Sequence, residues 1–153
     1  MNSFDDSPHL NDFFVSTDKT LLDVPFITDE LTRTYWGHWL TLATVMKSID
    51  NSLCFGLYYR PGWAGNPHPL PRTKQVGFAR VVTDYATFAW ICDVIVAKPY
   101  QKRGLATFLM DIVMGHSDVR PRNCLLTTRD AHKLYAKFGF APMEAMKRMG
   151  EKG

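Results

Sequence analysis

Residues 87–128 constrain the fold most, because two strand-like runs flank a helix-like run there. Residues 87–96 read TFAWICDVIV, and this nearly continuous apolar run predicts a buried strand, as does NCLLTT at 123–128. Between them, apolar residues recur at helical spacing over 105–115, namely Leu105, Phe108, Leu109, Ile112 and Val113. A strand, a helix and a second strand in this order form a right-handed crossover unit within one sheet.

The remaining runs predict that this sheet is mixed. Strands are expected at 53–59 and 75–83, and the turn Asp84-Tyr85-Ala86 joins the second of these to the next strand as a hairpin. Further predictions are a strand at 13–15, helices at 29–36, 40–49 and 131–138, and a final strand or two within 140–149. We expect Asp130 to cap the last helix and Gly139 to end it. The order of elements indicates an α/β fold built on a mixed sheet.

Length and composition narrow the class of protein. The chain has 153 residues, 46% of them apolar, which favours a single folded domain over 1–153 and excludes a disordered chain. Residues 1–10 are expected to be a loose leader, and the Pro-rich residues 60–74 a long loop that is either a functional flap or simply mobile. No apolar run approaches the roughly 18 residues that span a membrane, and the acidic N-terminus is unlike a secretory signal. Since the three cysteines also lack a CxxC pair, we expect a cytoplasmic protein.

The turn inside the crossover unit has the composition of an anion site. Residues 101–106 read QKRGLA, so that a glycine lies at the start of the helix and two cations precede it. A helix N-terminus presents unpaired backbone amides with partial positive charge, and a glycine lets a ligand approach the backbone. These residues indicate a site for phosphate or pyrophosphate. A basic surface turn is an equal alternative, because neither dinucleotide glycine spacing nor a P-loop is present.

Two motifs in order resemble the GNAT family of N-acetyltransferases. DVIVAKPYQKRGLA, residues 93–106, is similar to the acetyl-CoA-binding motif of that family, whose pattern after a strand is [QR]-x-x-G-x-[GA]. LYAKFGF, residues 134–140, resembles the second signature, a helix that ends in L-Y-x-x-x-G-F. NSLCFG, QVGFARVVTD and TTRDAHKLY also resemble a bacterial-type subgroup of small members. The resemblance implies the GNAT fold, a mostly antiparallel sheet in which two parallel strands splay apart between flanking helices.

The resemblance implies that acetyl-CoA is the co-substrate and indicates which residues would bind it. The backbone of Val94, Ile95 and Val96 would pair with the pantetheine arm in the gap between the splayed strands. The motif that begins at Gln101 would bind the pyrophosphate through the amides of Lys102, Arg103, Gly104, Leu105, Ala106 and Thr107. Tyr135 would meet the CoA sulfur and protonate the leaving thiolate, a role that suits a weak acid. Thr128 departs from the family, which often has an asparagine there to hold the arm, and its reach is shorter.

Amine acetylation also needs a group that takes a proton, directly or through water. Asp93 is the main candidate, because a carboxylate in an apolar strand has a raised pKa unless it is paired. An ion pair between Asp93 and Arg80 is the equal alternative. Asp84, Asp130 and His132 are further candidates, and His132 lies three residues before Tyr135, on the same helix face.

The acceptor side is expected to use the early helices and the 60–74 loop, as the resemblance implies. Candidate substrate-binding residues are Tyr35, Trp36, Arg80 and His132, with His38, Trp39, Trp63 and His68 as further members of the group. An aromatic cluster can hold a cation against its ring faces, which favours a small amine or a lysine-like side chain. Core aromatics beside a mobile loop are an equal alternative.

These residues lead to one main functional prediction with one competitor. The main prediction is an acetyl-CoA-dependent N-acetyltransferase that acts on a primary amine of a small molecule or peptide. The competitor is a non-catalytic acyl-CoA-binding or regulatory module, which Thr128 and the undecided base motivate. We predict no metal site, no membrane association and no nucleic-acid partner, since a net charge of +3 and two short basic clusters are too sparse for a nucleic-acid stripe. The sequence does not decide between a monomer and a homodimer.

Overall fold

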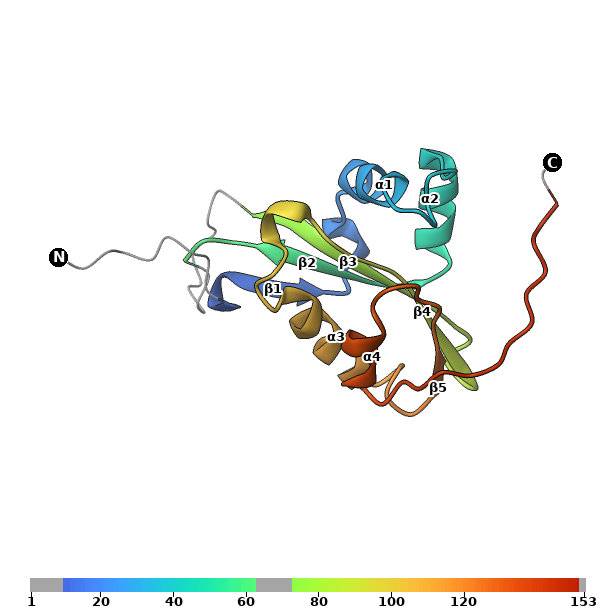
Figure 1. The fold of residues 1–153 in the computed structure, drawn as a ribbon. Coiled ribbons are helices and arrows are strands. Elements are labelled where there is room, and N and C mark those ends of the chain that lie inside the picture. The colour runs from blue at the N-terminus through green and yellow to red at the C-terminus, as the bar shows by residue number, and fades with distance from the viewer. Residues whose placement is uncertain (1–9, 63–72, 152–153) are drawn as a thin grey trace.

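The structure, a computed structural model, describes residues 10–62 and 73–151, which form a mixed five-stranded sheet between two layers of helices (Figure 1). The strands lie in chain order: β1 (Phe13–Ser16), β2 (Leu53–Tyr59), β3 (Lys74–Thr83), β4 (Phe88–Val96) and β5 (Asn123–Leu125). The first four pair antiparallel, and β5 pairs parallel to β4. The predicted mixed sheet with its parallel crossover is therefore confirmed. Most of the predicted leader and of the 60–74 loop, with Trp63 and His68, lies outside the described residues.

In the part of the chain that the structure describes, helices cover both faces of the sheet (Figure 1). They are α1 (Val24–Thr32) and α2 (Leu42–Asp50) on one face, and α3 (Leu105–Gly115) and α4 (His132–Ala136) on the other. Short 3-10 helices occupy Leu10–Asp12, Lys19–Leu21 and Lys98–Tyr100. Among the helices of the described residues, none has both the length and the apolar character that crossing a bilayer requires.

The first helix begins earlier than predicted because its cap lies earlier. The Asp23 carboxylate accepts from the Phe26 amide at 3.0 Å, and Pro25 fits the first turn, where its missing amide costs nothing. The helix ends at Thr32, so the predicted helix 29–36 is wrong in its second half. As a result, Tyr35 and Trp36 lie in the turn after α1 instead of on a helix face.

The α3 side chains that pack on the sheet differ in part from the predicted face. Leu105, Leu109, Met110 and Val113 are buried against β2, β3 and β4, whereas Ile112 is exposed. The prediction that Ile112 faces the core is therefore wrong. The face of α3 that packs on the sheet is the one that carries Leu105, Leu109 and Val113, together with Met110. On the opposite face, Ile27, Leu31, Val45 and Ile49 of the two early helices pack on Phe78 and Ile95.

A β-bulge interrupts β4 at Asp93. Phe78 pairs with Ile95 and Arg80 with Cys92, so that Asp93 and Val94 together oppose one residue of β3. Asp93 has a φ of 53°, in the left-handed region that a residue with a Cβ rarely adopts, at a cost on the order of 1–3 kcal/mol. The bulge shifts the alternation of side chains. It thereby turns the Asp93 carboxylate toward Arg80 on β3.

The parallel strands β4 and β5 pair over only three residues. Phe88, Ala89 and Trp90 pair with Asn123, Cys124 and Leu125, and no strand of the described chain continues along that edge of β4 beyond Trp90. The predicted strand 123–128 is therefore too long. The two strands part after this point, as the resemblance implied.

The C-terminal part of the chain differs most from the prediction. Residues 137–151 contain no helix or strand, so the final strands predicted within 140–149 are absent, and the end of the segment extends away from the body (Figure 1). Asp130 does not cap α4. Instead, the Thr128 hydroxyl accepts from the Ala131 amide at 3.0 Å. Gly139 follows the helix with a φ of 86°, as expected of a helix stop.

Candidate active site

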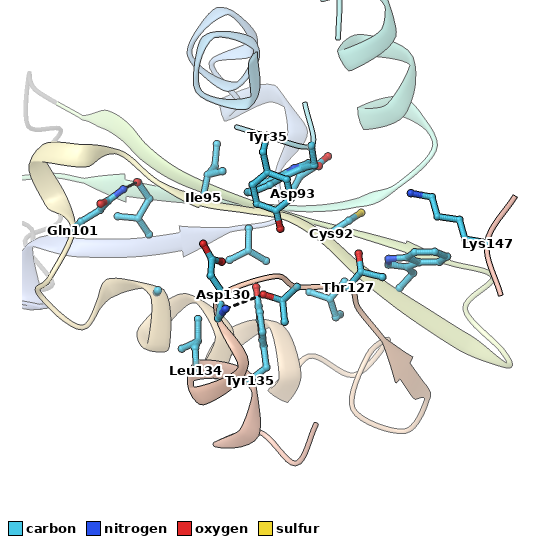
Figure 2. A pocket seen from close by; sticks show the side chains of 18 residues that line it. Tyr35, Cys92, Asp93, Ile95, Gln101, Thr127, Asp130, Leu134, Tyr135 and Lys147 are labelled. Carbon is cyan, nitrogen blue, oxygen red and sulfur yellow. Dashed lines mark hydrogen bonds between the residues drawn. The ribbon is translucent and has the colours of Figure 1, made fainter. Parts of the chain in front are cut away.

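A cavity of about 430 Å³ opens where β4 and β5 part (Figure 2). One wall is the β4 segment 90–96, and the facing wall is the connection from β5 into α4, with Thr127, Asp130 and Tyr135. Tyr35 and Trp36 from the turn after α1 close the cavity on the side of the early helices. Because the walls come from a splayed strand pair, an extended ligand can lie along the open edge of β4.

The turn at one end of the cavity leaves backbone amides without partners at the start of α3. Gly104 precedes α3 with a φ of 77° and provides no side-chain cap. Within the described residues, no group accepts from the amides of Leu105, Ala106 and Thr107, while the Phe108 amide bonds to the Gly104 carbonyl at 3.0 Å. These unpaired amides at the positive end of a helix of 11 residues fit a pyrophosphate.

The turn is also tied to the end of β4. The Gln101 side-chain amide donates to the Val96 carbonyl at 2.9 Å, and both residues line the cavity. Lys102 and Arg103 are exposed at the turn and do not line the cavity, although Lys102 has a φ of 64° that helps to shape the turn. Of the predicted cofactor residues, the structure thus places Val94, Ile95, Val96, Gln101, Ala106 and Thr128 in the cavity wall.

Tyr135 lies across the cavity from the open edge of β4. Its ring packs edge-on against Phe140, with 6.0 Å between the ring centroids. Burial raises the pKa of the Tyr135 hydroxyl, and Tyr35 and Asp130 add smaller effects in the same direction. The phenol therefore keeps its proton at neutral pH and can donate it to an anion that forms beside it.

Asp93 is held by two partners. Arg80 Nε donates to Asp93 Oδ2 at 2.7 Å, and the Trp36 indole donates to Oδ1 at 3.3 Å. The side chain of Asp93 is 8% exposed and that of Arg80 19%. The structure thus shows the ion pair that the sequence left as an alternative to an unpaired carboxylate. Arg80, predicted to bind substrate, also donates to Ser52 at 3.1 Å and does not line the cavity.

The side of the cavity next to the early helices is closed by a contact that the sequence did not reveal. The Arg129 guanidinium lies over the Tyr35 ring, 3.7 Å from its centroid, and Tyr35 meets Trp36 edge-on at 5.0 Å. The aromatic cluster therefore does hold a cation, but the cation belongs to the chain itself. This contact joins the turn after α1 to the connection that precedes α4.

The other candidate bases lie in different surroundings. His132 is exposed and lines a second cavity, of about 380 Å³, together with Tyr135 and residues 140–143. Asp84 accepts hydrogen bonds from Thr87 and Ala86 within its own turn, and these bonds lower its pKa. Asp130 lines the main cavity with Tyr135. Of the four predicted bases, therefore, Asp93 and Asp130 are the two at the main cavity.

Several residues of the cavity wall were not predicted as site residues. They are Trp90, Ile91, Cys92, Thr127, Ala131, Leu134 and Lys147. Burial raises the pKa of the Cys92 thiol to about 12, which leaves little thiolate for nucleophilic chemistry at neutral pH. In the sequence, the position of Cys92 next to Asp93 was the one indication that any of these residues belongs to the site. Nothing in the sequence around Lys147 indicates that it reaches the site.

The chain is similar in sequence and fold to known proteins. Residues 70–142 match a family model described as the acetyltransferase (GNAT) domain. A crystal structure from Xanthomonas campestris pv. campestris, of a protein described as belonging to the GNAT family, is 41% identical with a TM-score of 0.78, and the match covers 94% of each chain. A protein from Gibberella zeae, named as an acetyltransferase by inference, is 29% identical over 136 residues, which cover 82% of this chain and 77% of its own.

A further structure bears on the ligand. A Mycobacterium tuberculosis protein solved in complex with CoA has a TM-score of 0.62 at 20% identity, and the match covers 89% of this chain and 76% of that one. At this identity the likeness extends to the fold alone.

Proposed function

Because the chain belongs to the GNAT acetyltransferase family, whose members use acyl-CoA, we propose that it transfers an acetyl group from acetyl-CoA to a primary amine of a small molecule or peptide. The observation that carries the proposal is the splay between β4 and β5. It places an open strand edge, a helix N-terminus with unpaired amides and a protonated phenol around one cavity.

Two backbone features fit the co-substrate. The amides at the start of α3 bind the pyrophosphate, and the edge of β4 from Val96 to Val94 binds the extended arm. The four residue steps from Val96 to Cys92 span about 13 Å at the rise of an extended strand. An arm that follows this edge from the turn brings its reactive end toward Cys92 and Asp93, which share the cavity with Tyr135.

Two side chains then transfer the protons of the reaction: one donates a proton and the other accepts one. Acetyl-CoA supplies an acyl group that is activated as a thioester. Tyr135 donates a proton to the sulfur as it leaves, and burial keeps the Tyr135 hydroxyl protonated at neutral pH until then. Asp93 takes the proton of the amine, directly or through water, and Arg80 and Trp36 fix its position.

The test of this function is a panel of amines with release of free thiol as the readout. The panel contains polyamines, amino acids, small monoamines and lysine peptides, each with acetyl-CoA and the full chain. We expect at least one amine to release thiol above the rate seen without added amine. If acetyl-CoA binds but no member of a broad panel is acetylated, the transferase function is contradicted.

The second candidate function is an acyl-CoA-binding or regulatory module without chemistry. It is favoured by one observation, the engagement of Asp93 by Arg80, which leaves no unpaired carboxylate on β4 to act as a base. This module would bind acetyl-CoA as tightly as the transferase and would leave every amine in the panel unmodified. The same panel therefore separates the two candidates.

A further inference from the structure

A lysine of the chain itself reaches the acceptor end of the cavity. Lys147 lines the same cavity as Asp93 and Tyr135, although it belongs to the C-terminal segment. Figure 2 shows its side chain extending from that segment toward Cys92, at the end of the cavity away from Gln101. Since Gln101 belongs to the anion-binding turn, Lys147 lies opposite the side from which acetyl-CoA would enter.

The segment that carries Lys147 is not fixed to the body by polar contacts. Residues 141–151 form no hydrogen bond or ion pair with any part of the chain that the structure describes. The side chains of Met143, Met146 and Met149 are exposed, so packing does not fix the segment either. A small change in its path costs little, and the amine of Lys147 can therefore adjust its approach to the reacting end of the arm.

We propose that the active site acetylates Lys147 of its own chain. The inference rests on the proposed function, because it needs acetyl-CoA in the cavity, and it names a lysine side chain as an acceptor. A tethered amine competes well with dissolved amines, since its attachment to the chain keeps it near the reaction centre and so raises its effective concentration. Lys133 and Lys137 of the α4 region are exposed and do not line the cavity, so the same advantage does not extend to them.

The chemical step is balanced without any further reagent. The ammonium of Lys147 first gives a proton to water or to Asp93. Its nitrogen then forms a bond to the acetyl carbon as the carbon–sulfur bond breaks, and Tyr135 gives its proton to the sulfur. The nitrogen loses its second proton to water as the amide forms. Tyr135 regains a proton from water, so that the products are acetyl-lysine, free CoA thiol and one proton. The reaction removes the positive charge of Lys147 at the end of the cavity away from Gln101, where an added amine would bind.

The test is intact-mass analysis and peptide mapping of the full chain after incubation with acetyl-CoA alone. We expect one acetyl group per chain, on Lys147, at a first-order rate that does not change when the protein is diluted. Lys147→Arg should abolish this modification and keep the charge. Lys137→Arg, the matched control, should leave it unchanged. Tyr135→Phe should slow the modification at least about tenfold if the active site performs it.

Three outcomes would overturn the inference. The first is an unmodified Lys147 in a protein that acetylates amines of the panel, which leaves the proposed function intact. The second is an equal spread of acetyl groups over exposed lysines, insensitive to Tyr135→Phe, which indicates non-enzymatic acetylation. The third is a rate that rises with protein concentration, which indicates transfer between chains. Failure of the proposed function is recognised separately, because no amine of the panel would then be acetylated, whether or not acetyl-CoA binds.

Discussion

The two ends of the cavity are built from different parts of the chain. At the cofactor end, backbone groups form the site: the amides that begin α3 and the open edge of β4. At the acceptor end, side chains form it, and Tyr35, Arg129 and Lys147 come from three segments that are distant in the sequence. A backbone site requires only that local structure forms, whereas a side-chain site requires that tertiary packing brings its members together. The four variants below test this difference, in order of expected effect.

Tyr135→Phe tests the residue where the two ends meet. Removal of the hydroxyl should lower kcat by about 10²-fold, the lower part of the range for loss of a positioned acid, and leave the Kd of acetyl-CoA nearly unchanged. Steady-state kinetics and calorimetry measure the two quantities. Tyr85→Phe, at the exposed turn between β3 and β4, is the matched control and should behave like the wild type. A normal kcat in the Tyr135→Phe variant would contradict the assignment of Tyr135 as the proton donor.

Arg80→Met tests the support of the acceptor end. Removal of one partner from a mostly buried ion pair leaves the Asp93 carboxylate uncompensated, so the free energy of unfolding should fall by about 3 kcal/mol. Urea denaturation measures this change. The double variant with Asp93→Asn should lose less than the sum of the two single variants, because the pair is coupled. Additive losses would show that the pair contributes nothing as a pair.

Gly104→Ala tests the cofactor end alone. A Cβ at Gly104 would meet no atom within 4 Å, so the effect must come from its φ of 77°, which costs a residue with a Cβ about 1–2 kcal/mol. If the turn responds by changing its path, the amides move and the Kd of acetyl-CoA should rise about tenfold. Gly115→Ala, at the other end of α3 and equally open, should leave the Kd unchanged. Equal affinity in both variants would contradict the assignment of the turn to the pyrophosphate.

Arg129→Gln tests the acceptor end alone and should have the smallest effect. Loss of the contact with Tyr35 should raise the KM for the amine about threefold, in line with the modest energy of an exposed cation–π pair. The Kd of acetyl-CoA should stay the same. A change in the Kd of acetyl-CoA without a change in KM would break the division between the two ends.

The elements with strong periodicity could be predicted from the sequence. The predicted strand at 53–59 and helix at 105–115 match β2 and α3, because their apolar patterns and flanking residues agree on where each begins and ends. The turn before α3 could be predicted for the same reason, since a glycine between a strand and a helix is a local signal, and its binding of an anion stays a prediction. Helix α1 begins earlier than predicted, because the cap at Asp23 and Pro25 in the first turn place its start at Val24.

The contacts of the acceptor end could not be predicted. The pair of Asp93 with Arg80 depends on a bulge in β4, and an apolar run of nine residues gives no indication of where a bulge falls. The stacking of Arg129 on Tyr35 and the approach of Lys147 depend on how the connections fold over the sheet. The final strands were expected from apolar residues within 140–149, but pattern alone does not supply the neighbouring strand with which they would pair.

Calorimetric titration of the full chain with acetyl-CoA tests the central claim most directly, because every step described above begins with acetyl-CoA in the splay between β4 and β5. We predict saturable binding of one molecule per chain, with a Kd between the micromolar and millimolar ranges, that weakens in Gly104→Ala and persists in Arg129→Gln. The absence of binding up to millimolar acetyl-CoA, in a chain shown to be folded, would contradict the account.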